Sequence, residues 1–294
     1  MIGERRATLL LLLILCVAIV AFPNVEIVKA EGTIYIWADG TIEGTDKIQK
    51  DGNIYTLTGS IYDKRMIIEK SNIIIDGNGH TLSCHGATMY DVYLSNVEGV
   101  TIKNMVIDGG LNGIFVEDCT YVTISGNKIT EIGGGFPPNP MAAIILRHGG
   151  FHRIVGNSIV DNFVGIHFST SSNNRIYNNN FINNQGDLYD PGWYYPQTTP
   201  STYFLDDGLS GGNYWSNYNG TDSDEDGIGD TPYIYKPENE TLFTDNYPLM
   251  NPVPAIPEFP SWTPLLIMLV AVVGITFVYR HKLKKQSRRR FDGV

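Results

Sequence analysis

The sequence predicts an all-β protein built as a right-handed parallel β-helix, a solenoid whose coils stack on one another. Three observations predict it: short strand patterns recur at intervals near 22 residues, an isoleucine stands at the same place in each repeat, and an asparagine usually follows three residues later. The isoleucines are Ile75, Ile102, Ile124, Ile154 and Ile176, and the residues three positions on are Asn78, Met105, Asn127, Asn157 and Asn179. A β-sandwich would instead show antiparallel hairpins with two-residue turns.

The repeat has a direct physical reading. Equivalent strands of successive coils pair in parallel about 4.8 Å apart, so that each isoleucine lies on the isoleucine of the next coil. A turn asparagine carries amide donors and an acceptor, and it can therefore bond to the asparagines above and below it. We expect one buried isoleucine column and one neighbouring asparagine ladder, which Met105 interrupts.

The chain divides into consecutive regions around this solenoid. Residues 31–64 form an N-terminal cap with entry strands, and residues 65–187 form the coils. Residues 188–252 are rich in aromatic residues, proline and glycine and form a C-terminal cap, because a solenoid end exposes unpaired edges and an open apolar bore. Residues 253–260 are a proline-rich linker.

The N-terminus has the pattern of a signal peptide, residues 1–30. Arg5 and Arg6 precede an apolar run over residues 7–22, and small residues before position 31 suit a signal peptidase. The alternative is an uncleaved anchor, which the short apolar core disfavours.

The C-terminus has the pattern of a membrane anchor. Residues 261–279 are apolar and long enough to span a bilayer, and the tail 280–294 is rich in lysine and arginine. The positive-inside rule places this tail in the cytoplasm and the preceding domain outside. We expect a single-pass membrane protein with its N-terminal domain at the cell surface.

The charge balance limits the partners. The formal net charge is −10, and residues 31–260 hold 28 acidic and 11 basic side chains. Such an acidic body argues against nucleic acid as a partner.

Several motifs, in their order along the chain, resemble the NosD-like β-helix proteins, also called carbohydrate-binding and sugar-hydrolase repeats. The motifs lie at residues 51–57, 73–82, 176–184, 211–218 and 245–249. The resemblance covers roughly residues 45 to 250 and implies a β-helix fold in a surface or periplasmic setting. It implies no single activity, because the fold hosts lyases, hydrolases, epimerases and non-enzymes. Residues 257–260, with the helix and basic tail that follow, resemble PEF-type archaeal C-terminal sorting signals.

One acidic loop has the spacing of a calcium site. Asp222, Asp224, Asp226 and Asp230 occupy positions 1, 3, 5 and 9, and the Ile228 carbonyl occupies position 7. No helices flank the loop and Tyr233 stands where an EF-hand places glutamate, so the pattern indicates a structural Ca²⁺ loop of another kind. Asp245 or water could complete the coordination. The alternative is a solvated acidic turn.

The repeat register places four charged residues together on one outward face. They are Glu117, Asp118, Arg147 and His148, which a polysaccharide lyase or hydrolase could use as acid, base and uronate-binding groups. The alternative is that they are favourable cross-strand charge pairs.

A second outward column holds Tyr93, Phe115, Ile145 and His167. Its rings could stack on sugars, or the long loop Gly133–Met141 could cover them.

Copper is not expected, because the histidines are scattered and no soft-ligand cluster appears. Cys84 and Cys119 fall in non-adjacent coils, which predicts two free thiols. Asn219 and Asn239 begin sequons whose glycosylation the sequence leaves open.

The sequence as a whole predicts a membrane-anchored surface protein that binds carbohydrate or another cell-envelope component, without established catalysis. The alternative is a polysaccharide lyase or hydrolase acting on surface or extracellular glycans. A copper-related accessory role of the NosD type is less favoured.

Overall fold

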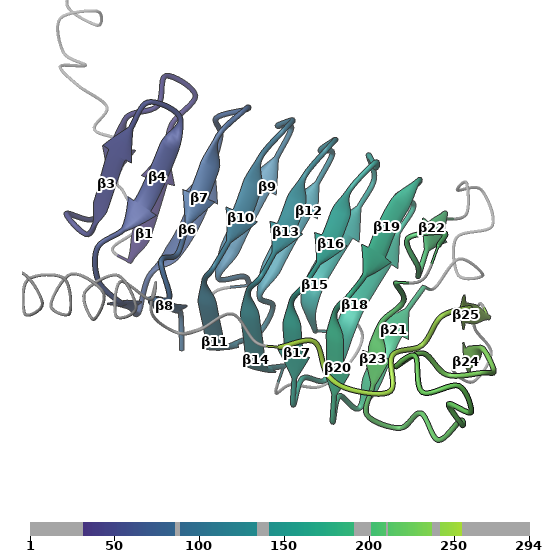
Figure 1. The fold of residues 1–294 in the computed structure, drawn as a ribbon. Coiled ribbons are helices and arrows are strands. Elements are labelled where there is room, and N and C mark those ends of the chain that lie inside the picture. Colours follow the sequence, from purple (N-terminus) through teal and green to yellow (C-terminus); the bar gives the residue numbers. More distant parts are fainter. Residues whose placement is uncertain are drawn as a thin grey trace, which may run out of the picture. The chain divides into compact units, whose positions relative to one another are not determined.

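The structure is a computed structural model that describes residues 32–85, 89–133, 141–190, 201–209, 211–236 and 242–254 (Figure 1). The chain separates into two compact parts, residues 1–33 and 34–294. The predicted signal peptide, most of the proline-rich linker, the segment 261–279 and the basic tail lie outside the described residues. Within the described ranges no helix is long and apolar enough to cross a membrane.

Three sheets make up the coils, and we name them A, B and C. Sheet A has the order β2 (Ile42–Glu43), β1 (Thr33–Ile36), β6 (Arg65–Ile68), β9 (Val92–Ser95), β12 (Ile114–Glu117), β15 (Ala142–Arg147), β18 (Val164–Ser169) and β21 (Gly186–Tyr189). Sheet B has the order β22 (Tyr203–Phe204), β19 (Asn174–Tyr177), β16 (Arg153–Val155), β13 (Thr123–Ser125), β10 (Thr101–Lys103), β7 (Ile74–Asp76), β4 (Ile54–Leu57) and β3 (Ile48–Asp51). Sheet C has the order β23 (Tyr214–Trp215), β20 (Asn180–Ile182), β17 (Ser158–Val160), β14 (Lys128–Ile132), β11 (Val106–Gly110), β8 (Thr81–Ser83) and β5 (Ile61–Tyr62).

Each coil adds one strand to sheet B, then one to sheet C, then one to sheet A, as β13, β14 and β15 do (Figure 1). From β4 and β6 onward, strands of successive coils pair in parallel. The entry pairs β1–β2 and β3–β4 are antiparallel, as is the separate pair of β24 (Tyr233–Tyr235) with β25 (Phe243–Asp245). This is the arrangement of a parallel β-helix, and the predicted all-β class is confirmed.

The predicted isoleucine column is confirmed. Ile75, Ile102, Ile124, Ile154 and Ile176 are register partners in sheet B, and none is exposed to solvent. Sheet C adds a second inward column, which contains Leu82, Ile107, Ile129, Ile159, Phe181 and Trp215. Because a parallel sheet buries its inner face, these stacked apolar side chains form the core.

The asparagine ladder is also confirmed from Asn127 onward. The backbone N–H and side-chain amide of Asn157 both donate to Oδ1 of Asn179, at 3.0 and 2.9 Å. The same amide donates to the Ile124 carbonyl at 2.9 Å. Asn127 donates to Asn157 in the same way, so each asparagine satisfies the turn backbone of its neighbours.

The prediction that Asn78 belongs to this ladder is wrong. Val106 is paired with Thr81, which places Met105 opposite His80 instead of Asn78. Asn78 takes a turn conformation with φ of 50°, and its amide points to the Leu57 carbonyl. The first coil therefore has two more residues in this turn than the coil that follows it. The ladder begins at the Met105 N–H, which donates to Oδ1 of Asn127 at 3.0 Å.

The ladder ends in the C-terminal cap at a carboxylate. Asn179 donates to Asn213, whose backbone N–H donates to Oδ2 of Asp245 at 2.7 Å. The indole N–H of Trp215 donates to the same oxygen at 2.8 Å. A carboxylate accepts hydrogen bonds without donating, so it closes a chain of donors.

Aromatic rings close the apolar bore above the last coil. Trp215 stacks on Phe181 with ring centroids 4.4 Å apart, and Tyr233 stacks on Trp215 with centroids 4.6 Å apart. Phe243 and Tyr203 stack at 4.9 Å. Tyr203 and Trp215 are among the residues expected to cover the solenoid end, whereas Tyr233 and Phe243 were not predicted to do so.

Replacing Asn157 with leucine should lower the free energy of unfolding by about 1–3 kcal/mol, because the Asn127 N–H and the Ile124 carbonyl lose partners in a dry site. Urea unfolding of the variant measures the change. Asn53→Leu, at an exposed position, is the matched control and should shift the midpoint little. Equal stability of the two variants would contradict a structural role for the ladder.

Candidate functional site

The predicted charged face lies on the outside of sheet A. Glu117 on β12 is the register partner of Arg147 on β15, and a guanidinium nitrogen lies 3.1 Å from its carboxylate. The Tyr93 hydroxyl donates to the other carboxylate oxygen at 2.5 Å. The hydrogen bond from Tyr93, followed by that from Arg147, holds the pKa of Glu117 below its usual value. Glu117 is thus ionised and has no proton to donate to a leaving group.

Asp118 and His148 form a second, separate pair. Both residues take left-handed turn conformations, with φ of 52° and 55°. Nδ1 of His148 lies 3.2 Å from a carboxylate oxygen of Asp118, and both side chains are half exposed. The four predicted residues are therefore neighbours, but they engage one another in two pairs. Their catalytic role stays a prediction.

The second predicted column is present and mostly buried. Tyr93, Phe115, Ile145 and His167 are successive register partners across β9, β12, β15 and β18. Phe115 is 7% and His167 is 9% exposed. This low exposure favours coverage over an open sugar platform. Residues 134–140, which were expected to supply the cover, lie outside the described residues.

His167 is neutral at physiological pH. Burial, reinforced by the charge of Arg147, lowers the pKa of His167 to about 4. Its ring packs edge-on to Tyr189 at 5.0 Å, which suits an uncharged imidazole.

The acidic loop brings three of its predicted ligands together. Asp222, Asp224 and Asp226 each offer a carboxylate oxygen, and these oxygens lie within 4.8 Å of one another. Hard carboxylate oxygens are the ligands that Ca²⁺ prefers. The three residues fit such an ion and could hold it. The backbone pins the loop to the cap, because the Gly229 N–H donates to the Pro248 carbonyl at 2.8 Å.

The other two predicted calcium residues have different surroundings. The Asp230 carboxylate accepts hydrogen bonds from Ser223 and Thr221, which lower its pKa. Ile228 forms a backbone bridge with Leu249. Asp245, considered as an additional ligand, lies at the end of the asparagine ladder with both oxygens accepting hydrogen bonds.

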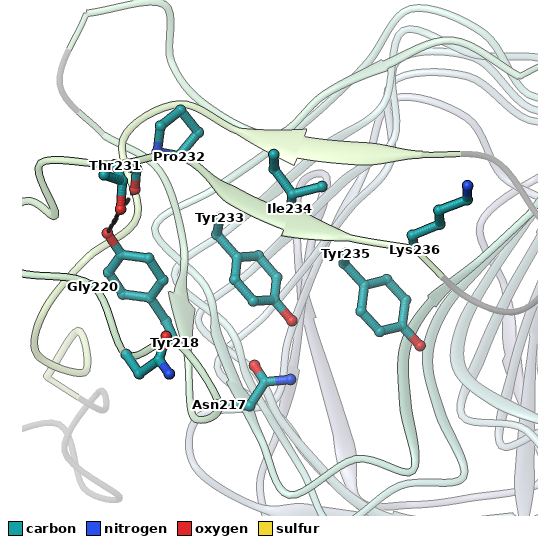
Figure 2. A pocket seen from close by; sticks show the side chains of 10 residues that line it. Asn217, Tyr218, Gly220, Thr231, Pro232, Tyr233, Ile234, Tyr235 and Lys236 are labelled. Atoms are coloured by element: carbon teal, nitrogen blue, oxygen red, sulfur yellow. Dashed lines mark hydrogen bonds between the residues drawn. The ribbon is translucent and has the colours of Figure 1, made fainter.

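A cleft of about 480 Å³ lies in the cap beside β24 (Figure 2). Its lining includes Asn217, Tyr218, Tyr235 and Lys236, and Figure 2 shows Tyr218 reaching Thr231, whose carbonyl accepts its hydroxyl at 2.6 Å. Asn219, which begins one of the sequons, also lines it. From the sequence, Tyr218 was expected only to cover the bore and Tyr235 had no predicted role, because no repeat register extends into this segment.

Asp91 is a buried acid that was not predicted from the sequence. The Asp91 carboxylate accepts the Cys84 N–H at 2.7 Å, and its second oxygen has no hydrogen-bond partner within the described structure. Burial raises the pKa of Asp91 to about 8. Cys84 and Cys119 are both buried and are not joined by a disulfide, as predicted.

Residues 23–220 match the family described as "Periplasmic copper-binding protein (NosD)". The chain is similar to "Probable ABC transporter binding protein NosD" of Pseudomonas aeruginosa, with 34% identity over 44% of this chain and 30% of that protein. A protein of the same description from Stutzerimonas stutzeri is 30% identical over 41% of this chain and 28% of its own length.

A "Cell surface glycoprotein" of Methanothermus fervidus is 28% identical over 42% of this chain and 21% of its own length. Each match spans less than a third of the relative. No solved structure matches the chain.

Calcium should stabilise the cap. Ion binding to the folded loop should raise the free energy of unfolding by about 1–3 kcal/mol in millimolar Ca²⁺ relative to EDTA, seen as a higher thermal midpoint. Asp224→Ala combined with Asp226→Ala should abolish the difference. Glu225→Ala, an exposed acid in the same loop outside the three-carboxylate group, should retain it. An identical midpoint in EDTA and Ca²⁺ would reject the ion.

Asp91 should make stability fall as the pH approaches 8. Its folded-state pKa of about 8 lies above the ordinary value of 3.8, so its stabilising effect is complete below about pH 4 and is lost as pH rises through about 8. The pKa values of His152 and His167 are lowered to about 4 by burial, so both histidines are neutral in folded and unfolded chains above about pH 7.

The thermal midpoint should therefore decline between about pH 7 and pH 8. Asp91→Asn, which still accepts the Cys84 N–H, should flatten this decline, and the exposed control Asp161→Asn should not. A decline that survives in Asp91→Asn would show that another group causes it.

Proposed function

Since the chain belongs to the NosD family, we propose that it is a cell-surface β-helix protein that binds carbohydrate or another envelope component without catalysing a reaction. Its similarity to a cell surface glycoprotein supports the surface setting. The observation that carries the non-catalytic part is the pairing of charges on sheet A.

Glycoside hydrolysis and uronate elimination both need a group that exchanges a proton with the substrate. Glu117 is held ionised by Tyr93 and Arg147. Arg147 is also placed over the Phe115 ring, 4.9 Å from its centroid, which fixes it against the sheet. This arrangement suits a stable, rigid face better than a catalytic one. The polysaccharide-active enzyme remains the alternative that the test below must exclude.

Copper fits the described residues poorly, although the family description names it. The group of three potential metal ligands found in the described ranges is made of carboxylates alone. Copper is favoured by imidazole, thiolate and thioether ligands. Calcium in the acidic loop is therefore the metal that we propose, in a structural role.

The chain's attachment to the cell is proposed from its sequence. Residues 1–30 would direct export, residues 261–279 would span the membrane, and the basic tail 280–294 would stay in the cytoplasm. The terminal segment would then act as a sorting signal of the PEF type. We also infer right-handed coils, because parallel strand crossovers are almost always right-handed.

The full chain in detergent, applied to a glycan array, should bind a subset of glycans and leave them intact. Reducing-end and unsaturated-uronate assays on the bound glycans should show no product. Glu117→Gln with Arg147→Gln should leave glycan binding unchanged. Product formed by the natural chain and lost in this variant would establish the enzyme instead.

Alkaline extraction of membranes tests the anchor. The full chain should stay with the membrane, because residues 261–279 would be buried among the lipids. A chain ending at Pro254 should be released. Release of the full chain under the same conditions would reject the membrane span.

A further inference from the structure

Sheet B carries an outward surface unlike the paired face of sheet A. Arg153 on β16 and Arg175 on β19 are register partners on adjacent strands, and both side chains are exposed. Neither makes an ion pair with another described residue. Like charges directly opposite each other destabilise a sheet. The chain is rich in acidic residues, yet these two arginines lie side by side without an ion-pair partner among the described residues.

Each arginine lies over an aromatic ring. The guanidinium carbon of Arg153 is 5.3 Å from the Tyr177 ring centroid, and that of Arg175 is 5.5 Å from the Phe204 centroid. Phe204 is 52% exposed. Stacking of this kind holds the guanidinium groups in place while their N–H edges stay open to a ligand.

Two further rings stand at the turn that leads into sheet B. Tyr121 and Phe151 are 60% and 52% exposed and stack on each other with centroids 5.3 Å apart. Phe151 precedes Arg153 by two residues, so both belong to the same part of one coil.

The backbone at these rings is strained. Tyr121 and Phe151 have φ of 56° and 58°, a left-handed conformation that bulky side chains rarely adopt. The corresponding turn residues in other coils are Asn72, Gly99 and Asn173, which suit it. Both rings remain more than half exposed, so burial offsets little of this strain. Residues held in such conformations concentrate at functional sites.

We propose that Tyr121, Phe151, Arg153, Arg175, Tyr177 and Phe204 form a binding strip for an acidic polysaccharide whose chain runs along the stacked coils. This inference rests on the proposed carbohydrate binding and names its site and ligand class. The exposed ring faces suit the C–H faces of sugars, and the adjacent guanidinium groups suit two carboxylates.

The negative charge of the whole domain disfavours a ligand with a higher density of negative charge. The body of the chain is strongly acidic, and the strip offers only two cations. A DNA duplex carries about one negative charge per 1.7 Å of its axis and would meet more repulsion than these two residues offset. A single polyuronate chain carries one carboxylate on each sugar, which is a lower charge density than that of the duplex, and it can place two carboxylates on the strip.

The test measures binding of the full chain in detergent to oligogalacturonate, to its methyl ester and to oligo(dT) by calorimetry. Arg153→Gln with Arg175→Gln should weaken oligogalacturonate binding by about tenfold or more, and methyl esterification should weaken it similarly. Tyr121→Asn with Phe151→Asn should also weaken it while keeping or raising the thermal midpoint, because asparagine suits this turn. Lys128→Gln with Lys236→Gln removes the same charge from exposed positions outside sheet B and should have little effect.

Unchanged oligogalacturonate binding after loss of both arginines would overturn the strip. Tighter binding of oligo(dT) than of oligogalacturonate would overturn the ligand class. Binding of neutral glycans on the array without any polyuronate binding would reject the strip and leave the proposed function standing. Failure to bind any glycan would reject both the strip and the carbohydrate-binding part of the proposed function.

Discussion

The structure depends on satisfying the backbone at its turns. A stacked coil pairs its strands with the coils on either side, but its corners bring N–H and carbonyl groups into a dry interior. Asparagine solves this because one amide both donates and accepts, and it can repeat the same bonds from coil to coil. Asn162 and Asn184 form a second such ladder at another corner, and His152 with Asn174 serves the third. Each corner therefore has its own polar column beside the apolar ones.

The sequence predicts those parts of the structure that repeat from coil to coil. The isoleucine column and the ladder through Asn157 were predictable, because a fixed register places equivalent residues on one another. The error at Asn78 arose where two residues were added to one turn, since spacing alone does not show which residue keeps the register. The ladder's end at Asp245 was not predictable either, because the chain passes through an irregular segment before it returns.

The same limit applies to the surface sites. The register predicted that Glu117 would lie beside Arg147, and it does. Whether the two would pair or remain free for a substrate depends on side-chain geometry and on Tyr93 from a third strand. The strip on sheet B was not predictable, because its rings and arginines look like ordinary outward residues in the repeat. They are distinguished by their exposure, by their backbone conformations and by the lack of an ion pair to either arginine within the described structure.

The ladder and the acidic loop are physically connected through a few bonds in the cap. Asp245 accepts the last ladder N–H with one oxygen and the Tyr247 N–H with the other. The next residue, Pro248, accepts the Gly229 N–H, which belongs to the acidic loop. Burial raises the pKa of Asp245 to about 6. The hydrogen bonds from these donors act in the opposite direction and help to keep its carboxylate ionised near neutral pH. An ion that orders the loop would also fix the segment that carries Asp245, and it would thereby stabilise the end of the polar column on which the coils depend.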